Sequence, residues 1–173
     1  VPAFYNLPVG KPRAMTSYVK SALVSALQPL HGKLDTLELP KDFTALSLER
    51  VTFPAEFMDM HVKIGATVPQ KLVLWYVVDV EVSEPMKLSV LLGYDGPVKM
   101  WIDGKPMYTD LKGINPAVPD AHAVAWKPSA GRHRIAIALD TNEGKAWGVF
   151  LRFERLGLTQ KQIATPAYAM RSE

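Results

Sequence analysis

Apolar positions along most of the chain recur every second residue, which is the period of a β-strand with one buried face. The run 72–82 begins as continuous apolar sequence and then alternates valine with acidic residues. The same alternation recurs in 86–92, 133–140 and 145–155. The inward-facing positions that we expect are Val78, Val80, Val82, Leu88, Val90, Leu92, Ile135, Ile137, Leu139, Trp147, Val149, Leu151 and Phe153.

Turn-forming residues separate these runs, among them Ser83-Glu84-Pro85 and Asp95-Gly96-Pro97. The runs return about every 10 to 14 residues, which leaves no room for a helix between them. A parallel sheet with crossover helices is therefore disfavoured, and two packed antiparallel sheets are favoured. We predict an all-β fold, an antiparallel β-sandwich of jelly-roll type with about eight strands between residues 45 and 155.

The stretch 98–107, VKMWIDGKPM, predicts a hairpin at Asp103-Gly104, because both positions of such a turn need positive φ. Val98, Met100 and Ile102 share one face of the first strand, and Trp101 lies on the other. If the first set is core, Trp101 faces solvent or a groove, and if the register is reversed, Trp101 is core. The base rate for tryptophan favours a largely buried side chain.

The residues before the sandwich have a different period. Segment 16–30 follows helical spacing, with Thr16 or Ser17 as N-cap and Pro29 near its end. We predict an N-terminal helix packed on or beside the sandwich. Its apolar stripe would be Val19, Ala22, Leu23, Ala26, Leu27 and Leu30. The expected organisation is an extended lead-in and helix over 1–40, the β-sandwich domain over 41–156, and a C-terminal tail over 157–173.

Composition narrows the class of protein. The chain of 173 residues is 48% hydrophobic with a net charge of +3 and no cysteine, which is typical of one globular domain without disulfides or thiolate metal sites. Its positive charges are scattered and its apolar runs are short, so neither a nucleic acid nor a membrane is expected as a partner. Because the chain starts at Val1, we expect a processed protein or part of a larger one.

A family resemblance follows from three groups of residues, which together cover about 70–155. The first runs from an aspartate through a tryptophan strand to a hairpin, the second opens the later strand 133–140, and the third lies in the last strand. They are Asp95, Val98, Trp101, Asp103, Gly104 and Lys105, then Gly131, His133 and Arg134, then Trp147, Gly148, Phe150 and Phe153. This order resembles the galactose-binding-like jelly-roll domains, of carbohydrate-binding-module type, that are attached to bacterial glycoside hydrolases and polysaccharide lyases.

The resemblance implies a non-catalytic carbohydrate-binding module, extracellular or periplasmic, in a larger polysaccharide-degrading enzyme with an adjacent catalytic domain. Sugar recognition needs a flat aromatic ring and groups that hydrogen-bond hydroxyls. The irregular stretch 108–124 and the nearby turns offer both. The candidate residues are Trp101, Tyr108, Asn115, Asp120, His122, Asn142, Lys145 and Trp147, with Tyr94 and Trp126 as weaker candidates.

Two other functions stay open. The same sandwich serves as a structural or protein-interaction domain that positions a catalytic unit. A small glycoside hydrolase or lyase would use a carboxylate pair such as Glu143 with Asp140 or Glu56 with Asp59. No cofactor is expected. A structural calcium is an alternative, held by turn aspartates drawn from Asp95, Asp103, Asp110, Asp120 and Asp140.

Overall fold

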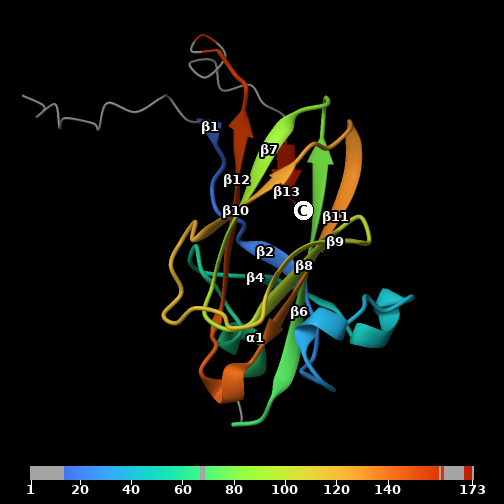
Figure 1. The fold of residues 1–173 in the computed structure, drawn as a ribbon, viewed down its shortest axis with the longest axis vertical. Coiled ribbons are helices and arrows are strands. Elements are labelled where there is room, and N and C mark those ends of the chain that lie inside the picture. The colour runs from blue at the N-terminus through green and yellow to red at the C-terminus, as the bar shows by residue number, and fades with distance from the viewer. Residues whose placement is uncertain (1–13, 67–68, 160, 162–169, 173) are drawn as a thin grey trace, which may run out of the picture.

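Two antiparallel sheets pack face to face, so the all-β sandwich is confirmed (Figure 1). The computed structural model describes residues 14–66, 69–159, 161 and 170–172. Sheet A runs in the order β1 (Ala14–Met15), β12 (Gly148–Leu156), β7 (Lys87–Tyr94), β10 (His122–Trp126), with β5 (Met58–Asp59) also paired to β12. Sheet B runs β4 (Glu49–Thr52), β2 (Ser21–Val24), β6 (Leu72–Val82), β11 (Gly131–Asp140), β8 (Val98–Ile102), β9 (Lys105–Asp110), and β3 (Gln28–Pro29) and β13 (Met170–Ser172) also pair with β6.

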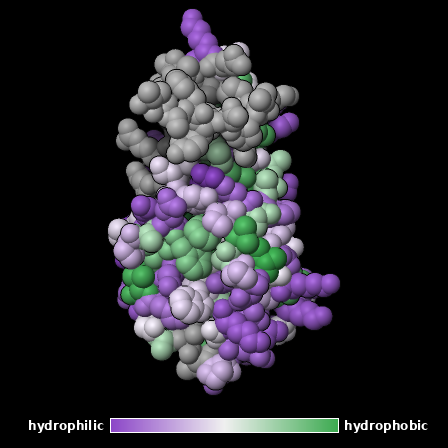
Figure 2. Space-filling model, turned by 90° about the vertical axis from the view of Figure 1, so that its left-hand side faces the viewer, coloured by the Kyte–Doolittle hydropathy of each residue, from purple (hydrophilic) through white to green (hydrophobic). Residues whose placement is uncertain are grey.

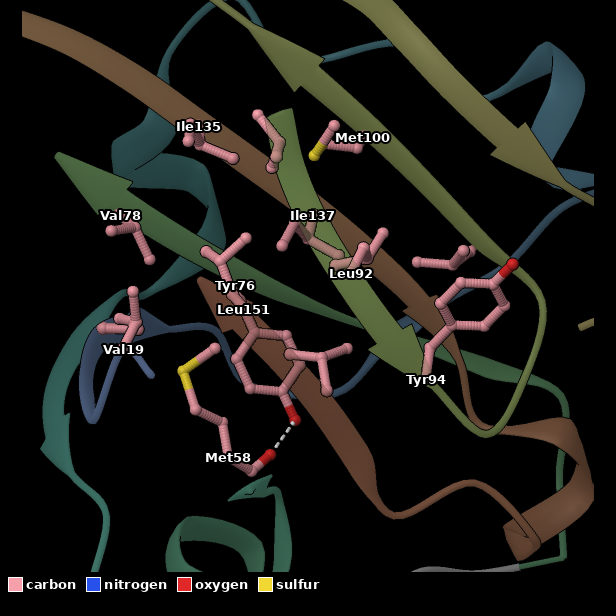
Figure 3. Close-up of a cluster of buried hydrophobic side chains, with 14 of the residues drawn as sticks. Val19, Met58, Tyr76, Val78, Leu92, Tyr94, Met100, Ile135, Ile137 and Leu151 are labelled. Carbon is pink, nitrogen blue, oxygen red and sulfur yellow. Dashed lines mark hydrogen bonds between the residues drawn. The ribbon is translucent and has the colours of Figure 1, made fainter. Parts of the chain in front are cut away.

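The main core fills the space between the sheets, and the period-two positions supply it as expected. The inward-pointing residues are Val78, Val80 and Val82 of β6, Leu88 and Leu92 of β7, Ile135 and Ile137 of β11, and Leu151 of β12. Tyr76 lies among them and donates a hydrogen bond from its hydroxyl to the carbonyl of Met58 at 3.0 Å (Figure 3). Trp147 departs from the expectation, because it precedes β12 and is 53% exposed.

A second apolar layer covers the outer face of sheet B. Segment 30–48 contains two short 3₁₀ helices, η1 (Leu34–Thr36) and η2 (Phe43–Leu46), and lies on the side of sheet B away from sheet A (Figure 1). Its leucines pack on the outward residues of β6, β8 and β11. The middle of sheet B, formed by β6, β11 and β8, is therefore packed on both faces, and all five residues of β8 are buried.

The N-terminal helix prediction is wrong. Residues 21–24 form β2 and residues 28–29 form β3, and both strands join sheet B. The described helical elements are η1, η2, η3 (Asn142–Gly144) and the one-turn α1 (His61–Ile64). None of the helices in the described residues is long and apolar enough to cross a bilayer. Residues 1–13 of the expected lead-in over 1–15, and most of the expected tail, lie outside the described residues.

The predicted hairpin is confirmed. Asp103 has φ 50° and Gly104 has φ 81°, which are the two left-handed residues that a tight turn between β8 and β9 requires. The Asp103 carboxylate also accepts hydrogen bonds from the backbone N–H of Arg134 and from the ring of His133. The turn is thereby attached to the neighbouring strand β11.

Candidate functional site

The sequence-derived candidates do not form one site, and Trp101 lies farthest from solvent. It is 2% exposed, and its ring stacks on Trp75 with centroids 5.1 Å apart. The Nζ atom of Lys99 lies 5.0 Å from the ring centroid, and segment 30–48 covers the pair. Trp101 thus packs the second layer, and it presents no ring face on which a sugar could stack.

Tyr108 and His122 form a stacked pair that joins the edge strands β9 and β10 of the two sheets. Their ring centroids are 4.0 Å apart with an interplanar angle of 14°. The Tyr108 hydroxyl lies 2.5 Å from that of Tyr94, which also donates to the Asp110 carboxylate at 2.7 Å. Burial, and then these hydrogen bonds, raise the pKa of Tyr94. The pair closes one side of the sandwich, so one ring face of each is already occupied.

Asp120 belongs to a different cluster, on the outer face of sheet A. Its carboxylate accepts two hydrogen bonds from the Arg152 guanidinium, one of them from Nε at 2.8 Å. It also accepts one from the Tyr18 hydroxyl at 3.2 Å. The guanidinium carbon of Arg152 lies 4.4 Å from the Tyr18 ring centroid. A bidentate pair of this kind fixes the plane of the guanidinium group.

Aromatic rings continue this cluster along β12. Phe150 points outward, two residues before Arg152, and meets the edge of Tyr18 at 5.6 Å and the ring of Phe57 at 4.7 Å between centroids. Opposite Phe150 in the register stands Gly93, where a Cβ atom would lie 2.3 Å from the carbonyl oxygen of Val118. The absence of a side chain at Gly93 lets the connection between β9 and β10 lie against the sheet beside these rings.

Three other candidates meet at the end of the sandwich. The buried Asp95 carboxylate accepts hydrogen bonds from the backbone N–H groups of Trp147 and Gly148 at 2.8 and 3.1 Å. Asn115 donates from Nδ2 to the carbonyls of Asp95 and Lys145, each at 3.2 Å. Burial raises the pKa of Asp95, and these backbone donors oppose that shift. This network fixes the backbone that carries the exposed Trp147.

Trp147 is exposed and lies one residue before β12. Strand β5 pairs with the start of β12 through Asp59 and Gly148. The His61 ring meets the Trp147 ring edge-on at 4.9 Å, and its Nδ1 lies 2.6 Å from the Asp59 carboxylate. Strand β12 begins at Gly148, and from there to Arg152 it advances four residues, or about 13 Å. We use the name aromatic face for the cluster around Phe150 together with the Trp147–His61 pair near the start of β12; its members are Tyr18, Phe57, Phe150, Trp147, His61, Asp120 and Arg152.

Figure 2 looks onto the side of the molecule that carries sheet A. Apolar side chains gather across the middle of this side, with hydrophilic ones beside and below them. Val118 is one of the exposed large hydrophobic residues and contributes its backbone to the same area. The aromatic face therefore combines accessible rings with an oriented guanidinium and carboxylate.

Asn142 lies apart from the aromatic face, in a strained turn that borders a separate pocket. Among the described residues, no three His, Asp or Glu side chains are grouped to hold a metal ion. Each turn aspartate that we considered for calcium instead accepts hydrogen bonds from protein donors. These are Asp95, Asp103, Asp110, Asp120 and Asp140.

Sequence reasoning identified Asp120 and Trp147 but missed most of the aromatic face. Phe150 and Arg152 carried a usable signal, because they alternate with the core residues of β12 and so must point outward. Tyr18 and Phe57 carried none, since they lie outside the long alternating runs. Their place beside Phe150 is set by the pairing of segments far apart in the chain.

The fold resembles parts of larger glycoside hydrolases. A GH2 β-galacturonidase from Eisenbergiella tayi matches 85% of this chain with a TM-score of 0.54 and 14% identity, over 25% of its own length. A GH31 α-xylosidase from Xanthomonas citri matches 95% of this chain with a TM-score of 0.53 and 13% identity, over 18% of its length. A β-glucosidase from Kluyveromyces marxianus in complex with glucose matches 84%, with a TM-score of 0.51 and 7% identity, over 17% of its length.

This chain thus spans a quarter or less of each of these solved chains. At such identities the likeness concerns the fold alone. No protein-family model and no curated protein matches the sequence.

Proposed function

We propose that this chain is a non-catalytic carbohydrate-binding domain and that the aromatic face is its binding surface. It works beside a catalytic domain of a larger polysaccharide-degrading enzyme, outside the cytoplasm, in the extracellular space or the periplasm. The observation that carries the proposal is the cluster of the Tyr18 and Phe57 rings around Phe150 of β12, next to the Arg152–Asp120 pair. The likeness of the fold to small parts of glycoside hydrolase chains supports the accessory role.

The chemistry of the face suits a neutral sugar chain. Ring faces of Tyr18, Phe57 and Trp147 offer apolar area for the C–H side of pyranose rings. The Arg152 guanidinium and the Asp120 carboxylate supply a donor and an acceptor for neighbouring hydroxyls. The face is long and open, so it favours an extended chain over a single sugar, with modest affinity per ring.

The carboxylates of the face support a binding role over hydrolysis. Hydrolysis of a glycosidic bond needs two carboxyl groups that flank the bond, one of them free to act as an acid. Here Asp120 is held by Arg152 and Asp59 by His61. Both carboxylates therefore orient a neighbouring side chain.

The test measures binding of soluble neutral polysaccharides to the purified chain by affinity gel electrophoresis and isothermal titration calorimetry. Tyr18→Ala and Trp147→Ala should each weaken binding at least fivefold, as expected when about 1 kcal/mol of ring stacking is lost. Leu156→Ala is the matched control, because Leu156 is an exposed apolar residue of β12 outside the aromatic face. Circular dichroism checks that each variant is folded.

Binding that survives both aromatic substitutions would contradict the assignment of the face. A second function, the positioning of a catalytic domain, is favoured by the small share of each solved chain that this fold spans. A folded chain that binds no glycan but forms a stable complex with its neighbouring catalytic domain would establish that function instead.

A further inference from the structure

A pocket lies at one end of sheet B and is separate from the aromatic face. It has a volume of about 590 Å³, within the range of small-molecule sites. Segments far apart in the chain line it: the start of η1, the start of β6, the turn before β8, the end of β9 and the turn after β11. Its lining residues are Lys33, Leu34, Lys71, Pro97, Leu111, Lys112, Asp140, Asn142 and Glu143. We call it the lysine pocket.

Three ammonium groups from three different segments give the pocket its charge. Lys71 donates one hydrogen bond to the carbonyl of Gly32 at 3.1 Å, which leaves other N–H groups for a ligand. Among the residues that the structure describes, none of Lys33, Lys71 and Lys112 takes part in an ion pair. Three like charges that share one hollow repel one another, and a bound anion would relieve this repulsion.

The two carboxylates of the pocket differ in their availability. Asp140 is 5% exposed, and its Oδ1 accepts a hydrogen bond from the backbone N–H of Asn142 at 2.7 Å. Glu143 is exposed at the rim. The Asp140 carboxylate therefore stabilises the turn that follows β11. The Glu143 carboxylate is an acceptor that a ligand hydroxyl can reach.

The turn that carries Asn142 and Glu143 is strained and firmly anchored. Both residues have left-handed backbone angles, φ 50° and φ 56°, although neither is glycine. The Thr141 hydroxyl donates to the carbonyl of Gln70 at 2.8 Å and accepts from the N–H of Leu72 at 3.1 Å. A strained backbone of this kind persists only where the surrounding structure stabilises it. Here the strained turn positions the Asn142 amide and the Glu143 carboxylate at the rim of the lysine pocket.

We propose that the lysine pocket binds a small hydroxylated organic anion of about monosaccharide size. The carboxylate of the ligand contacts the ammonium groups of Lys33, Lys71 and Lys112. Its hydroxyls exchange hydrogen bonds with Asn142 and Glu143. Its apolar side packs on the lining residues Pro97 and Leu111. The site is independent of the aromatic face, so either proposal stands if the other fails.

The test is calorimetry with sodium glucuronate as the probe at low ionic strength. Methyl glucoside tests the hydroxyls alone, and sodium acetate tests the carboxylate alone. We expect glucuronate to bind at least tenfold more tightly than either fragment, with affinity that falls as salt is added. Amide chemical shifts of residues 140–145 should move on binding, whereas those of the aromatic face should not.

Substitutions measure whether each charged side chain strengthens or weakens glucuronate binding. Lys33→Ala and Lys112→Ala should each weaken glucuronate binding about two- to fivefold, as for a solvent-accessible ion pair. Glu143→Gln should strengthen it, because a like charge is removed from beside the ligand. Lys105→Ala, an exposed lysine on β9 outside the pocket, is the matched control and should change nothing.

Three results would overturn the proposal. One is glucuronate binding no tighter than methyl glucoside, which removes the anion requirement. Another is acetate binding as tightly as glucuronate, which leaves a bare ion site. The third is unchanged glucuronate affinity in both lysine variants. Tyr18→Ala, which removes a ring of the aromatic face, should leave glucuronate binding intact.

Discussion

Trp101 and Trp147 occupy opposite environments, and each predicts a different consequence of substitution. Trp101 is stacked on Trp75 under segment 30–48, whereas Trp147 stands at the surface against His61. Trp101→Ala should lower the free energy of unfolding by about 3–5 kcal/mol, because it leaves a cavity in the second layer. Chemical denaturation measures this loss of unfolding free energy. Trp147→Ala should change the same quantity by less than about 1 kcal/mol, and equal losses in both variants would contradict the assignment.

His133 predicts a pH-dependent stability. Burial alone would lower its pKa, but hydrogen bonds to the Asp103 carboxylate at 2.6 Å and to the Ser129 carbonyl at 2.7 Å outweigh burial and raise the pKa above 6.5. Both ring nitrogens face acceptors, so the protonated ring is the one that satisfies both.

Because the folded pKa is the higher one, this contribution is fully present below pH 6.5 and is lost as the pH rises through the folded value. Denaturation midpoints measured between pH 6 and pH 9 should therefore fall in the native chain. His133→Gln should remove this part of the slope. A slope that is unchanged in the variant would show that other groups cause it.

At the scale of residues, the sequence predicts the direction in which a side chain points better than the environment that surrounds it. Alternation placed Met100 and Trp101 on opposite faces of β8, and the Asp103-Gly104 turn followed from the need for positive φ. Whether the outward face is covered depends on where segment 30–48 lies. The base rate for tryptophan favoured a buried Trp101, and this expectation is confirmed, but no local pattern around Trp101 shows which segment covers it.

At the scale of elements, segment 30–48 depends on a buried lysine. The Nζ atom of Lys99 donates to the carbonyls of Asp35 and Leu37, each at 2.8 Å. Lys99→Met keeps the apolar stem but leaves both carbonyls without this donor, so we expect a loss of about 1–3 kcal/mol in the free energy of unfolding. Hydrogen exchange should also become faster in η1, measured by mass spectrometry.

The control for this prediction is Lys105→Met, an exposed lysine on the next strand, with an expected change within about 0.5 kcal/mol. Faster exchange that is spread evenly over the chain, instead of being concentrated in 30–48, would contradict a local role for Lys99.

The error over segment 16–30 has a physical cause at this scale. A strand with one buried face alternates apolar and polar residues, and that pattern is easily recognised. Strand β2 packs on both of its faces, because Ala22 and Val24 point into the main core while Leu23 packs against the second layer. A continuous apolar run of this kind fits helical spacing as well as strand spacing. The long strands 72–82 and 131–140 were recognisable because parts of them still alternate or are bounded by turns.

The aromatic face belongs to the whole molecule, and this explains why the sequence predicts only fragments of it. Tyr18, Phe57, Asp120 and Phe150 come from four segments that meet only after both sheets have formed. Within one strand, the alternation of β12 is sufficient to place Phe150 and Arg152 outward. The partners of these two residues follow from strand order, and no spacing along the chain encodes that order.

The two apolar layers share their strands, which predicts how the whole chain unfolds. Tyr76 and Met100 point into the main core, whereas their neighbours Trp75 and Trp101 point into the second layer. Loss of either layer exposes one face of β6 and β8, so the layers should unfold together.

The sequence contains four tryptophans, so a Trp126→Phe, Trp147→Phe variant keeps only the pair in the second layer as a fluorescent probe. In guanidinium chloride, its fluorescence should follow the same transition as far-UV circular dichroism, which reports the strands of both sheets. A fluorescence midpoint at clearly lower denaturant would mean that segment 30–48 separates first. Sheet B would then keep its strands after losing its outer cover, and the shared-strand argument would fail.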